Sequence, residues 1–207
     1  SENKKMNLFD TIINESDNIL PHDGEVFFKR QLLNTKMANS YYKTLLNSIA
    51  WKNDEVFMFG KRIVTKREVA WYGNKEFEYT YSKIKKKALL WTKELLEIKL
   101  LVENETKETY NSCLLNLYHD ETEGMGWHSD DEKQLKHEAA IASLSFGSDR
   151  FFSFKHKITK EKVSVLLNHG TLLLMKGSTQ TNWLHQLPKT KFKKQPRINL
   201  TFRTILE

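Results

Sequence analysis

The stretch Arg197-Ile198-Asn199-Leu200-Thr201-Phe202-Arg203 alternates polar and apolar side chains over its whole length. Residues two apart point to the same side of a β-strand, so this pattern predicts a strand with one apolar face against a core. The other face carries two arginines and an asparagine. Arginines inside a barrel need anions beside them, and a dicarboxylate would supply two through charge-assisted hydrogen bonds. An ordinary edge strand with its arginines in water is the alternative interpretation.

Other short strands are predicted before this one, because apolar and β-branched residues recur between clusters of turn-forming residues. Gly147-Ser148-Asp149 and Asn168-His169-Gly170 are two of these clusters. Short strands at this spacing favour a sandwich or barrel with helices packed outside it. The predicted strands span residues 111–118, 139–146, 150–156, 162–167, 171–176, 181–186 and 197–204.

The first half of the chain has a more helical pattern. Apolar residues at helical spacing predict two early helices, at about 26–33 and 41–49, and a clear amphipathic helix over 88–104. Between them, two short strands at 56–59 and 62–64 are expected to form a hairpin or a tight bend around Gly60. We therefore expect an α+β fold in a single domain, 1–207. The apolar side of the third helix is assigned to Leu89, Leu90, Leu95, Leu96 and Leu100.

Composition indicates the environment. The 207 residues are 39% hydrophobic, which suits one domain with its own core. Cys113 is the one cysteine, so an internal disulfide is impossible and a reducing compartment is expected. Neither a secretory signal nor an apolar run of membrane-spanning length is found. We therefore expect a protein of the bacterial cytosol or nucleoid, or of a eukaryotic nucleus, with no membrane partner.

The net charge of +7 favours a polyanionic partner, nucleic acid above all. A solvated basic surface without such a partner is the alternative. Two clusters contribute much of the charge: Lys83, Lys85, Lys86 and Lys87 in one, and Lys189, Lys191, Lys193 and Lys194 in the other.

A possible metal site is formed by His128, Asp130 and His185. His128 and Asp130 point to one side if their segment is extended, and His185 would come from another strand. Two imidazoles and one carboxylate on one face leave the opposite metal positions free, as in non-haem Fe(II) oxygenases. A His-x-Asp pair is common by chance, and most lone histidines are surface or structural groups.

The strand at 111–118 repeats the polar pattern. Leu114, Asn116 and Tyr118 share one face, and the amide and the phenol offer neutral hydrogen bonds to a carboxylate. Alternatively, both side chains satisfy local backbone groups.

Five segments carry a resemblance to a known family: CLLNLY at 113–118, HSDDE at 128–132, ASLSFG at 142–147, His185 with Leu187-Pro188, and RINLTFR at 197–203. Together they resemble the AlkB family of Fe(II)- and 2-oxoglutarate-dependent dioxygenases, over roughly residues 55–204. The resemblance is closest to the branch that demethylates duplex DNA. It implies a double-stranded β-helix (jelly-roll) core at about 86–207, and an N-terminal extension with a nucleotide-recognition lid at about 1–85.

The resemblance implies roles for individual residues. His128, Asp130 and His185 look like iron ligands. The remaining pocket residues would bind 2-oxoglutarate: Arg197 and Tyr118 at its distal carboxylate, Arg203 and Asn116 at the carboxylate near the metal, and Asn199 and Leu114 along the pocket wall.

The resemblance also implies how a target base is held. Asp131 and Glu132 would touch it, their negative charge suiting a cationic methylated base; a solvated acidic turn is the alternative. Phe59-Gly60-Lys61 resembles a finger that wedges into a duplex where the base leaves. Lid residues would be Arg67, Tyr72, Tyr79 and Tyr81, with Tyr81 stacking on the base, although any single aromatic here could instead be core.

The implied activity is oxidative demethylation of bases such as 1-methyladenine and 3-methylcytosine in DNA, with release of formaldehyde. Fe(II) and 2-oxoglutarate would be the cofactors and dioxygen the cosubstrate. The expected partner of the monomeric enzyme is single- or double-stranded DNA. Demethylation of RNA is a second hypothesis, and an inactive nucleic-acid-binding module is a third.

Overall fold

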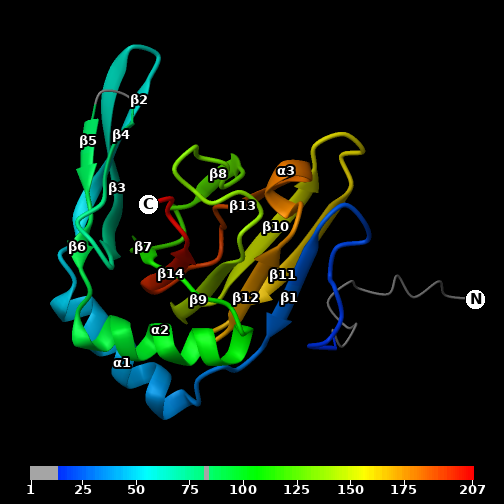
Figure 1. The fold of residues 1–207 in the computed structure, drawn as a ribbon, viewed down its shortest axis with the longest axis horizontal. Coiled ribbons are helices and arrows are strands. Elements are labelled where there is room, and N and C mark those ends of the chain that lie inside the picture. Colours follow the sequence, from blue (N-terminus) through cyan, green and yellow to red (C-terminus); the bar gives the residue numbers. More distant parts are fainter. Residues whose placement is uncertain (1–13, 82–83) are drawn as a thin grey trace, which may run out of the picture.

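The computed structural model describes residues 14–81 and 84–207, apart from the side chains of Met58 and Tyr81. Most strands lie in two facing sheets, with two helices on the outer side of the larger sheet (Figure 1). The helices are α1 (Thr35–Ser48), α2 (Lys93–Thr106) and α3 (Thr179–Asn182). The strands are β1 (Glu25–Lys29), β2 (Lys52–Met58), β3 (Lys61–Gly73), β4 (Glu78–Tyr81), β5 (Ile84–Lys87), β6 (Leu89–Leu90), β7 (Ser112–Tyr118), β8 (Met125–His128), β9 (Ile141–Gly147), β10 (Arg150–His156), β11 (Lys162–Leu167), β12 (Leu172–Lys176), β13 (Trp183–Leu187) and β14 (Arg197–Arg203).

The two sheets have the topology of a jelly roll. The large sheet has the order β1-β12-β9-β14-β7-β3-β2, with β6 beside β3, and the small sheet has the order β11-β10-β13-β8. Neighbours such as β9 and β14 are far apart in the sequence, because the chain crosses repeatedly between the sheets. The predicted double-stranded β-helix is confirmed, and all the strands predicted after residue 110 are present, with ends shifted by at most two residues.

β14 lies in the middle of the large sheet and separates two environments. Ile198, Leu200 and Phe202 are fully buried and pack in one core with residues of α1 and α2. Arg197 and Arg203 lie on the opposite face, toward the small sheet. The alternation predicted from the sequence is therefore correct, and the strand is central, not an edge strand.

The early helix predicted at 26–33 is wrong. Glu25–Lys29 forms β1, the edge strand beside β12, and its Val26 and Phe28 side chains are both buried. The two buried side chains are two residues apart, as expected for a strand. The sequence did not reveal this period, because the neighbouring residues are apolar as well. The second predicted helix is confirmed as α1, whose N-cap Asn34 accepts a hydrogen bond from the Met37 amide at 2.9 Å.

α2 begins later than predicted and buries a different face. Residues 89–90 pair with β3 as β6, and the Thr92 side chain caps the helix by accepting from the Leu95 amide at 3.2 Å. The predicted apolar side was wrong except for Leu95, because adjacent leucines do not reveal which one faces inward. The buried residues are Leu95, Ile98 and Val102, whereas Leu89, Leu90, Leu96 and Leu100 are exposed.

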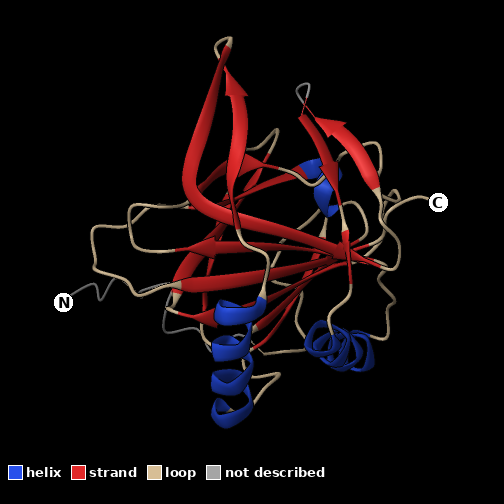
Figure 2. Cartoon of the chain, turned by 90° about the vertical axis from the view of Figure 1, so that its left-hand side faces the viewer, coloured by secondary structure: helices blue, strands red, loops and turns tan. Residues whose placement is uncertain are grey.

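Two hairpins extend from the sheets at the end away from α1 and α2 (Figures 1 and 2). The first, β2–β3, confirms the predicted hairpin, and its turn places Phe59 and Gly60 at φ 51° and 73°. Positive φ values at both positions match the twist of the two strands of a hairpin. A non-glycine residue with such a φ value has a strained backbone. Phe59 is nevertheless 96% exposed at the tip. The second hairpin, β4–β5, was not predicted; its turn and Lys83 lie outside the described residues.

Cys113 is buried in β7, and burial raises the pKa of its thiol. It therefore packs as a small apolar side chain. Within 14–81 and 84–207, none of the helices combines the length and the apolarity needed to cross a bilayer.

Candidate metal and dianion site

His128 and His185 are direct neighbours in the small sheet. They are opposite each other in the β8–β13 register, with ring centroids 4.3 Å apart. Asp130 reaches both from the loop after β8: its Oδ1 lies 3.8 Å from His128 Nε2 and 3.7 Å from His185 Nε2. The three candidate ligand atoms lie within 4.8 Å of one another. The predicted triad is thus brought together, although a loop and not a strand places the carboxylate.

Protonation favours metal binding at these three side chains. His128 Nδ1 lies 2.7 Å from the Gly126 carbonyl oxygen, which can only accept, so Nδ1 carries the proton and Nε2 keeps its lone pair. Burial lowers the pKa of His185 to about 4, so its imidazole is neutral. Burial alone would raise the pKa of Asp130, but His185, Arg203 and His128 outweigh it and hold that pKa below the ordinary value. Two imidazoles and a carboxylate suit Fe(II).

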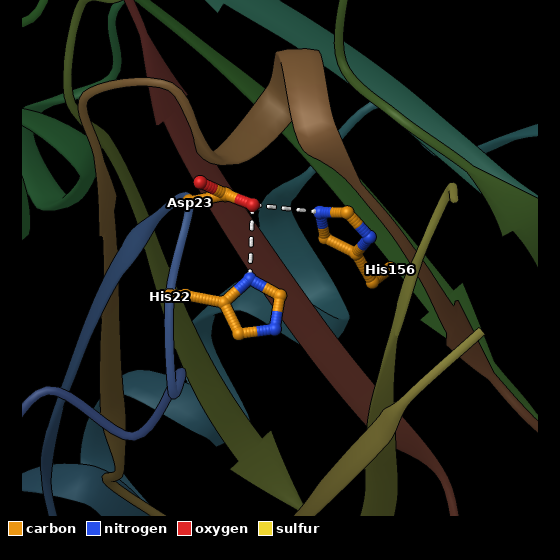
Figure 3. Close-up of side chains that lie close together, drawn as sticks. All are labelled: His22, Asp23 and His156. Atoms are coloured by element: carbon orange, nitrogen blue, oxygen red, sulfur yellow. Dashed lines mark hydrogen bonds and ion pairs between the residues drawn. The ribbon is translucent and has the colours of Figure 1, made fainter. Parts of the chain in front are cut away.

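A second described cluster has the same composition: His22, Asp23 and His156 (Figure 3). Asp23 Oδ2 lies 2.9 Å from His22 Nδ1 and 3.2 Å from His156 Nε2. However, His156 Nδ1 accepts hydrogen bonds from the backbone N–H groups of Ile158 and Thr159. A neutral imidazole has one N–H group and one nitrogen lone pair. Because Nδ1 uses the lone pair, His156 Nε2 carries the proton and has no lone pair with which to bind a metal. This cluster instead ties the segment before β1 to the end of β10.

The second cluster should make stability depend on pH. Hydrogen bonds to Asp23 and then Glu161 raise the pKa of His22 above 6.5. The stabilisation is therefore complete below pH 6.5 and is lost as pH rises through the raised folded-state pKa. We expect the difference in melting temperature between wild type and His22→Gln to shrink over that window, as measured by thermal unfolding at a series of pH values. A constant difference would contradict this account.

Arg197 is a buried guanidinium with no carboxylate partner among the described residues. Its Nη2 donates to Ser145 Oγ at 2.9 Å and Asn199 Oδ1 at 3.3 Å, and its Nε has no hydrogen-bond partner in the part of the chain that the structure describes. The guanidinium carbon lies 5.7 Å from the centre of the Tyr118 ring. Burial lowers the pKa of Arg197 to about 10, which still leaves it charged at neutral pH. A buried charge of this kind is costly unless an anion joins it.

Arg203 lies at the metal end of the same strand. Its Nη1 is 3.9 Å from Asp130 Oδ2 and 3.3 Å from Glu132 Oε1, and no described residue forms a hydrogen bond with its buried Nε. The site therefore combines a three-ligand metal face with two buried arginines that have unused donors. That combination fits a metal-bound dianion such as a dicarboxylate.

Comparison with known proteins identifies the family. Residues 25–203 match the sequence model of the 2OG-Fe(II) oxygenase superfamily. The chain is 38% identical over 183 residues to the human alpha-ketoglutarate-dependent dioxygenase alkB homolog 3, covering 84% of this chain and 63% of that protein. It is 39% identical over 160 residues to the mouse DNA oxidative demethylase ALKBH2, covering 73% of this chain and 67% of that protein. The chain belongs to the AlkB family of Fe(II)- and 2-oxoglutarate-dependent dioxygenases.

The AlkB-family fold is also seen in a solved structure, that of OsALKBH1. It superposes with a TM-score of 0.61 at 14% identity, over 89% of this chain and 99% of that one. This likeness supports the fold alone. The chain spans 62% of the length of the bovine alkB homolog 3. The cofactors of the family are Fe(II) and 2-oxoglutarate, and the triad and buried arginines described above fit both.

The AlkB-family pocket also includes residues of β7. The β7–β14 register places Tyr118 opposite Arg197 and Asn116 opposite Asn199, and Leu114 follows on the same face. Tyr118 is buried, and burial raises the pKa of its phenol. The cofactor residues predicted from the sequence therefore line one side of the large sheet.

The predicted substrate residues are more dispersed. Phe59 and Lys61 lie at the tip of the first hairpin, whereas Tyr79 lies nearer the pocket, with its ring 5.1 Å from that of Trp71. Asp131 and Glu132 follow the triad carboxylate, and Arg67 is buried. Tyr72 is not brought to this site: it is buried in the core beside α1, where its hydroxyl accepts from the Ala50 amide at 3.1 Å. The side chain of Tyr81 lies outside the described residues.

Sequence reasoning missed two residues that support the AlkB-family site. Ser145 accepts from Arg197, and its alternation with Ser143 in β9 could have revealed it. Gln180 Oε1 accepts from the Asp130 backbone amide at 2.9 Å and so holds the loop that carries the carboxylate. Nothing in the sequence near residue 180 indicates this contact, because α3 reaches the loop only in the folded chain.

Proposed function

We propose that this protein removes N-linked methyl groups oxidatively from bases of DNA, releasing formaldehyde. One observation carries the proposal: the His128–Asp130–His185 triad lies beside Arg203, and Arg197 on the same strand is buried with no anionic partner among the described residues. The relatives that share this family are named as a dioxygenase and as DNA oxidative demethylases. The nucleus or the bacterial nucleoid is the corresponding place of action.

The reaction has a defined balance of atoms. Bound Fe(II) and 2-oxoglutarate would supply the oxidation by dioxygen, in which one oxygen atom ends in succinate as carbon dioxide leaves and the other ends in a hydroxyl group on the N-methyl carbon. The resulting N-hydroxymethyl group breaks down to the N–H base and formaldehyde. His128, Asp130 and His185 would hold the metal, Arg197 and Arg203 would bind the two carboxylates of 2-oxoglutarate, and the site would position the methyl group.

The acidic residues after the triad support a cationic base as the target. A cavity of about 540 Å³ opens beside the triad, with Asp131 and Glu132 in its wall together with Asp130, Arg203 and Gln180. Glu132 is already paired with Arg203, whereas Asp131 has no ion pair among the described residues, and its carboxylate favours a positively charged ring, such as 1-methyladenine or 3-methylcytosine, over its neutral counterpart. The net charge of +7 supports a nucleic-acid strand as the carrier of that base.

The experiment compares three carriers of one lesion. The protein is incubated with Fe(II), 2-oxoglutarate and ascorbate, and with 1-methyladenine in single-stranded DNA, duplex DNA or RNA. We expect formaldehyde and succinate from at least one of the DNA strands. Faster turnover of RNA than of both DNA forms would replace the proposal by RNA demethylation, and no formaldehyde from any strand would exclude demethylation of this lesion.

The exposed Phe59 gives a specific expectation for duplex DNA. A ring held out at the tip of a hairpin can fill the gap that a flipped base leaves, and such stacking is worth about 1–3 kcal/mol. Phe59→Ala should therefore slow duplex repair by about tenfold and single-strand repair little. The matched control is Ile158→Ala, which removes another exposed apolar side chain, 82% accessible, at a different turn. Equal losses on both strand types would contradict a wedge role.

A further inference from the structure

A buried ion pair connects the first hairpin to the cofactor pocket. Arg67 of β3 is 7% exposed and Asp54 of β2 is 9% exposed. Arg67 Nη2 donates to Asp54 Oδ2 at 2.6 Å. The β2–β3 register shifts between residues 53 and 55. Asp54 lies at this shift, and its carboxylate points inward. Neither residue is needed to close the hairpin, whose strands pair on both sides of the shift.

The second terminal nitrogen of the Arg67 guanidinium group determines the orientation of the Asn116 amide. Arg67 Nη1 donates to Asn116 Oδ1. A guanidinium only donates, so it fixes the oxygen of the amide toward itself and the Nδ2 group away. Among the described residues, Asn116 Nδ2 donates to no protein atom. This free donor lies on the strand face that also carries Arg197, where a carboxylate oxygen would be its natural acceptor.

Asp54 also holds the second hairpin. Lys86 of β5 donates to Asp54 Oδ1 at 3.1 Å, and the Glu55 amide donates to the same oxygen at 3.0 Å. Burial alone would raise the pKa of Asp54, but Lys86 and Arg67 outweigh it and hold that pKa below its ordinary value. One carboxylate therefore joins β2, β3 and β5, and through Arg67 it reaches β7.

We propose that Arg67 and Asp54 are positioning residues for 2-oxoglutarate: Asp54 holds Arg67, and Arg67 holds the Asn116 amide with its donor toward the dicarboxylate. The inference deepens the proposed function and rests on its cofactor pocket. It also assigns Arg67 a role inside the protein, whereas the sequence resemblance suggested contact with the substrate. Because Asp54 binds Lys86 as well, both hairpins are connected to the cofactor that the pocket receives.

The test measures 2-oxoglutarate binding directly, with Mn(II) in place of Fe(II) so that no turnover occurs. Isothermal titration gives the affinity of wild type, Arg67→Met, Asp54→Asn and Asn116→Leu. Loss of a group that orients a ligand-binding residue typically lowers the affinity by about ten- to hundredfold. We expect Arg67→Met to weaken binding by at least about tenfold, and Asp54→Asn by less. Arg62→Met is the matched control, because it removes an exposed ion pair with Glu55 on the same hairpin and should leave the affinity unchanged.

A double substitution separates positioning from a merely structural role. Asn116→Leu removes the amide donor and adds no charge. If Arg67 acts through that donor, adding Arg67→Met to Asn116→Leu should cause little further loss of affinity. Additive losses, or unchanged affinity in Arg67→Met, would overturn the proposal. If Arg67→Met does not fold, Asp54→Asn provides the test instead. An unchanged affinity for 2-oxoglutarate in Asp54→Asn would then overturn the proposal. Wild type that binds 2-oxoglutarate but demethylates nothing would contradict the proposed function and not this inference.

Discussion

Asp130→Ala should abolish demethylation while the protein stays folded. Asp130 Oδ1 lies within 4 Å of both imidazole Nε2 atoms, so its removal leaves two ligands and no negative charge at the metal. Loss of a group that only orients a metal ligand lowers metal affinity or activity by about ten- to hundredfold. Loss of a ligand itself should therefore lower the activity by at least about a thousandfold. The fold should survive, because the carboxylate is held by electrostatics and not by packing in either hydrophobic core.

The measurement is formaldehyde release, with metal affinity determined in parallel. Asp23→Ala is the matched control, because it removes the carboxylate from the other His–Asp–His cluster. The control should keep both its metal affinity and its activity. If Asp23→Ala lost the activity and Asp130→Ala kept it, the assignment of the metal centre would be reversed.

Arg197→Met should lose 2-oxoglutarate binding without losing stability. Truncating one partner of a buried charge pair costs about 2–5 kcal/mol, so the affinity should fall by about thirtyfold or more. Without 2-oxoglutarate the same change removes a buried charge that has no carboxylate partner in the described chain. The free variant should therefore be as stable as wild type, or up to about 2 kcal/mol more stable.

Thermal unfolding with and without 2-oxoglutarate separates the two effects. Wild type should gain stability when 2-oxoglutarate and Mn(II) are added, because only the folded state binds them. Arg197→Met should gain the same stability from the metal, and about 2 kcal/mol less than wild type from saturating 2-oxoglutarate. Arg197→Lys tests geometry, since a lysine keeps the charge but lacks the forked donors. A normal gain from 2-oxoglutarate in Arg197→Met would show that its carboxylate is bound elsewhere.

The parts of the fold that the sequence predicted well are those with one buried face. In β14, a strict two-residue alternation separated Ile198, Leu200 and Phe202 from the two arginines, and the structure keeps that separation. The triad could be predicted because the resemblance supplied its third ligand. Spacing alone could not have excluded the other histidines, since the tautomer of His156 depends on two backbone amides that only the folded chain brings near.

Other parts depend on contacts between distant segments. The inward face of α2 was misjudged because Leu95 and Leu96 are alike in sequence, and only packing against β14 distinguishes them. Nothing in the sequence around Asp54 distinguishes it from other acidic residues, yet a register shift in β2–β3 turns it inward against Arg67. Such residues have no local pattern, because their partners are on other strands.

The central claim is that this triad and its arginines remove a methyl group by oxidation. The most direct test measures formaldehyde and unmethylated adenine together, from a 1-methyladenine oligonucleotide incubated with wild type, Fe(II), 2-oxoglutarate and ascorbate. The account predicts one formaldehyde for each adenine restored, and none with Asp130→Ala. Formaldehyde and adenine that appear equally with wild type and Asp130→Ala, or that fail to appear with wild type known to bind 2-oxoglutarate, would contradict it.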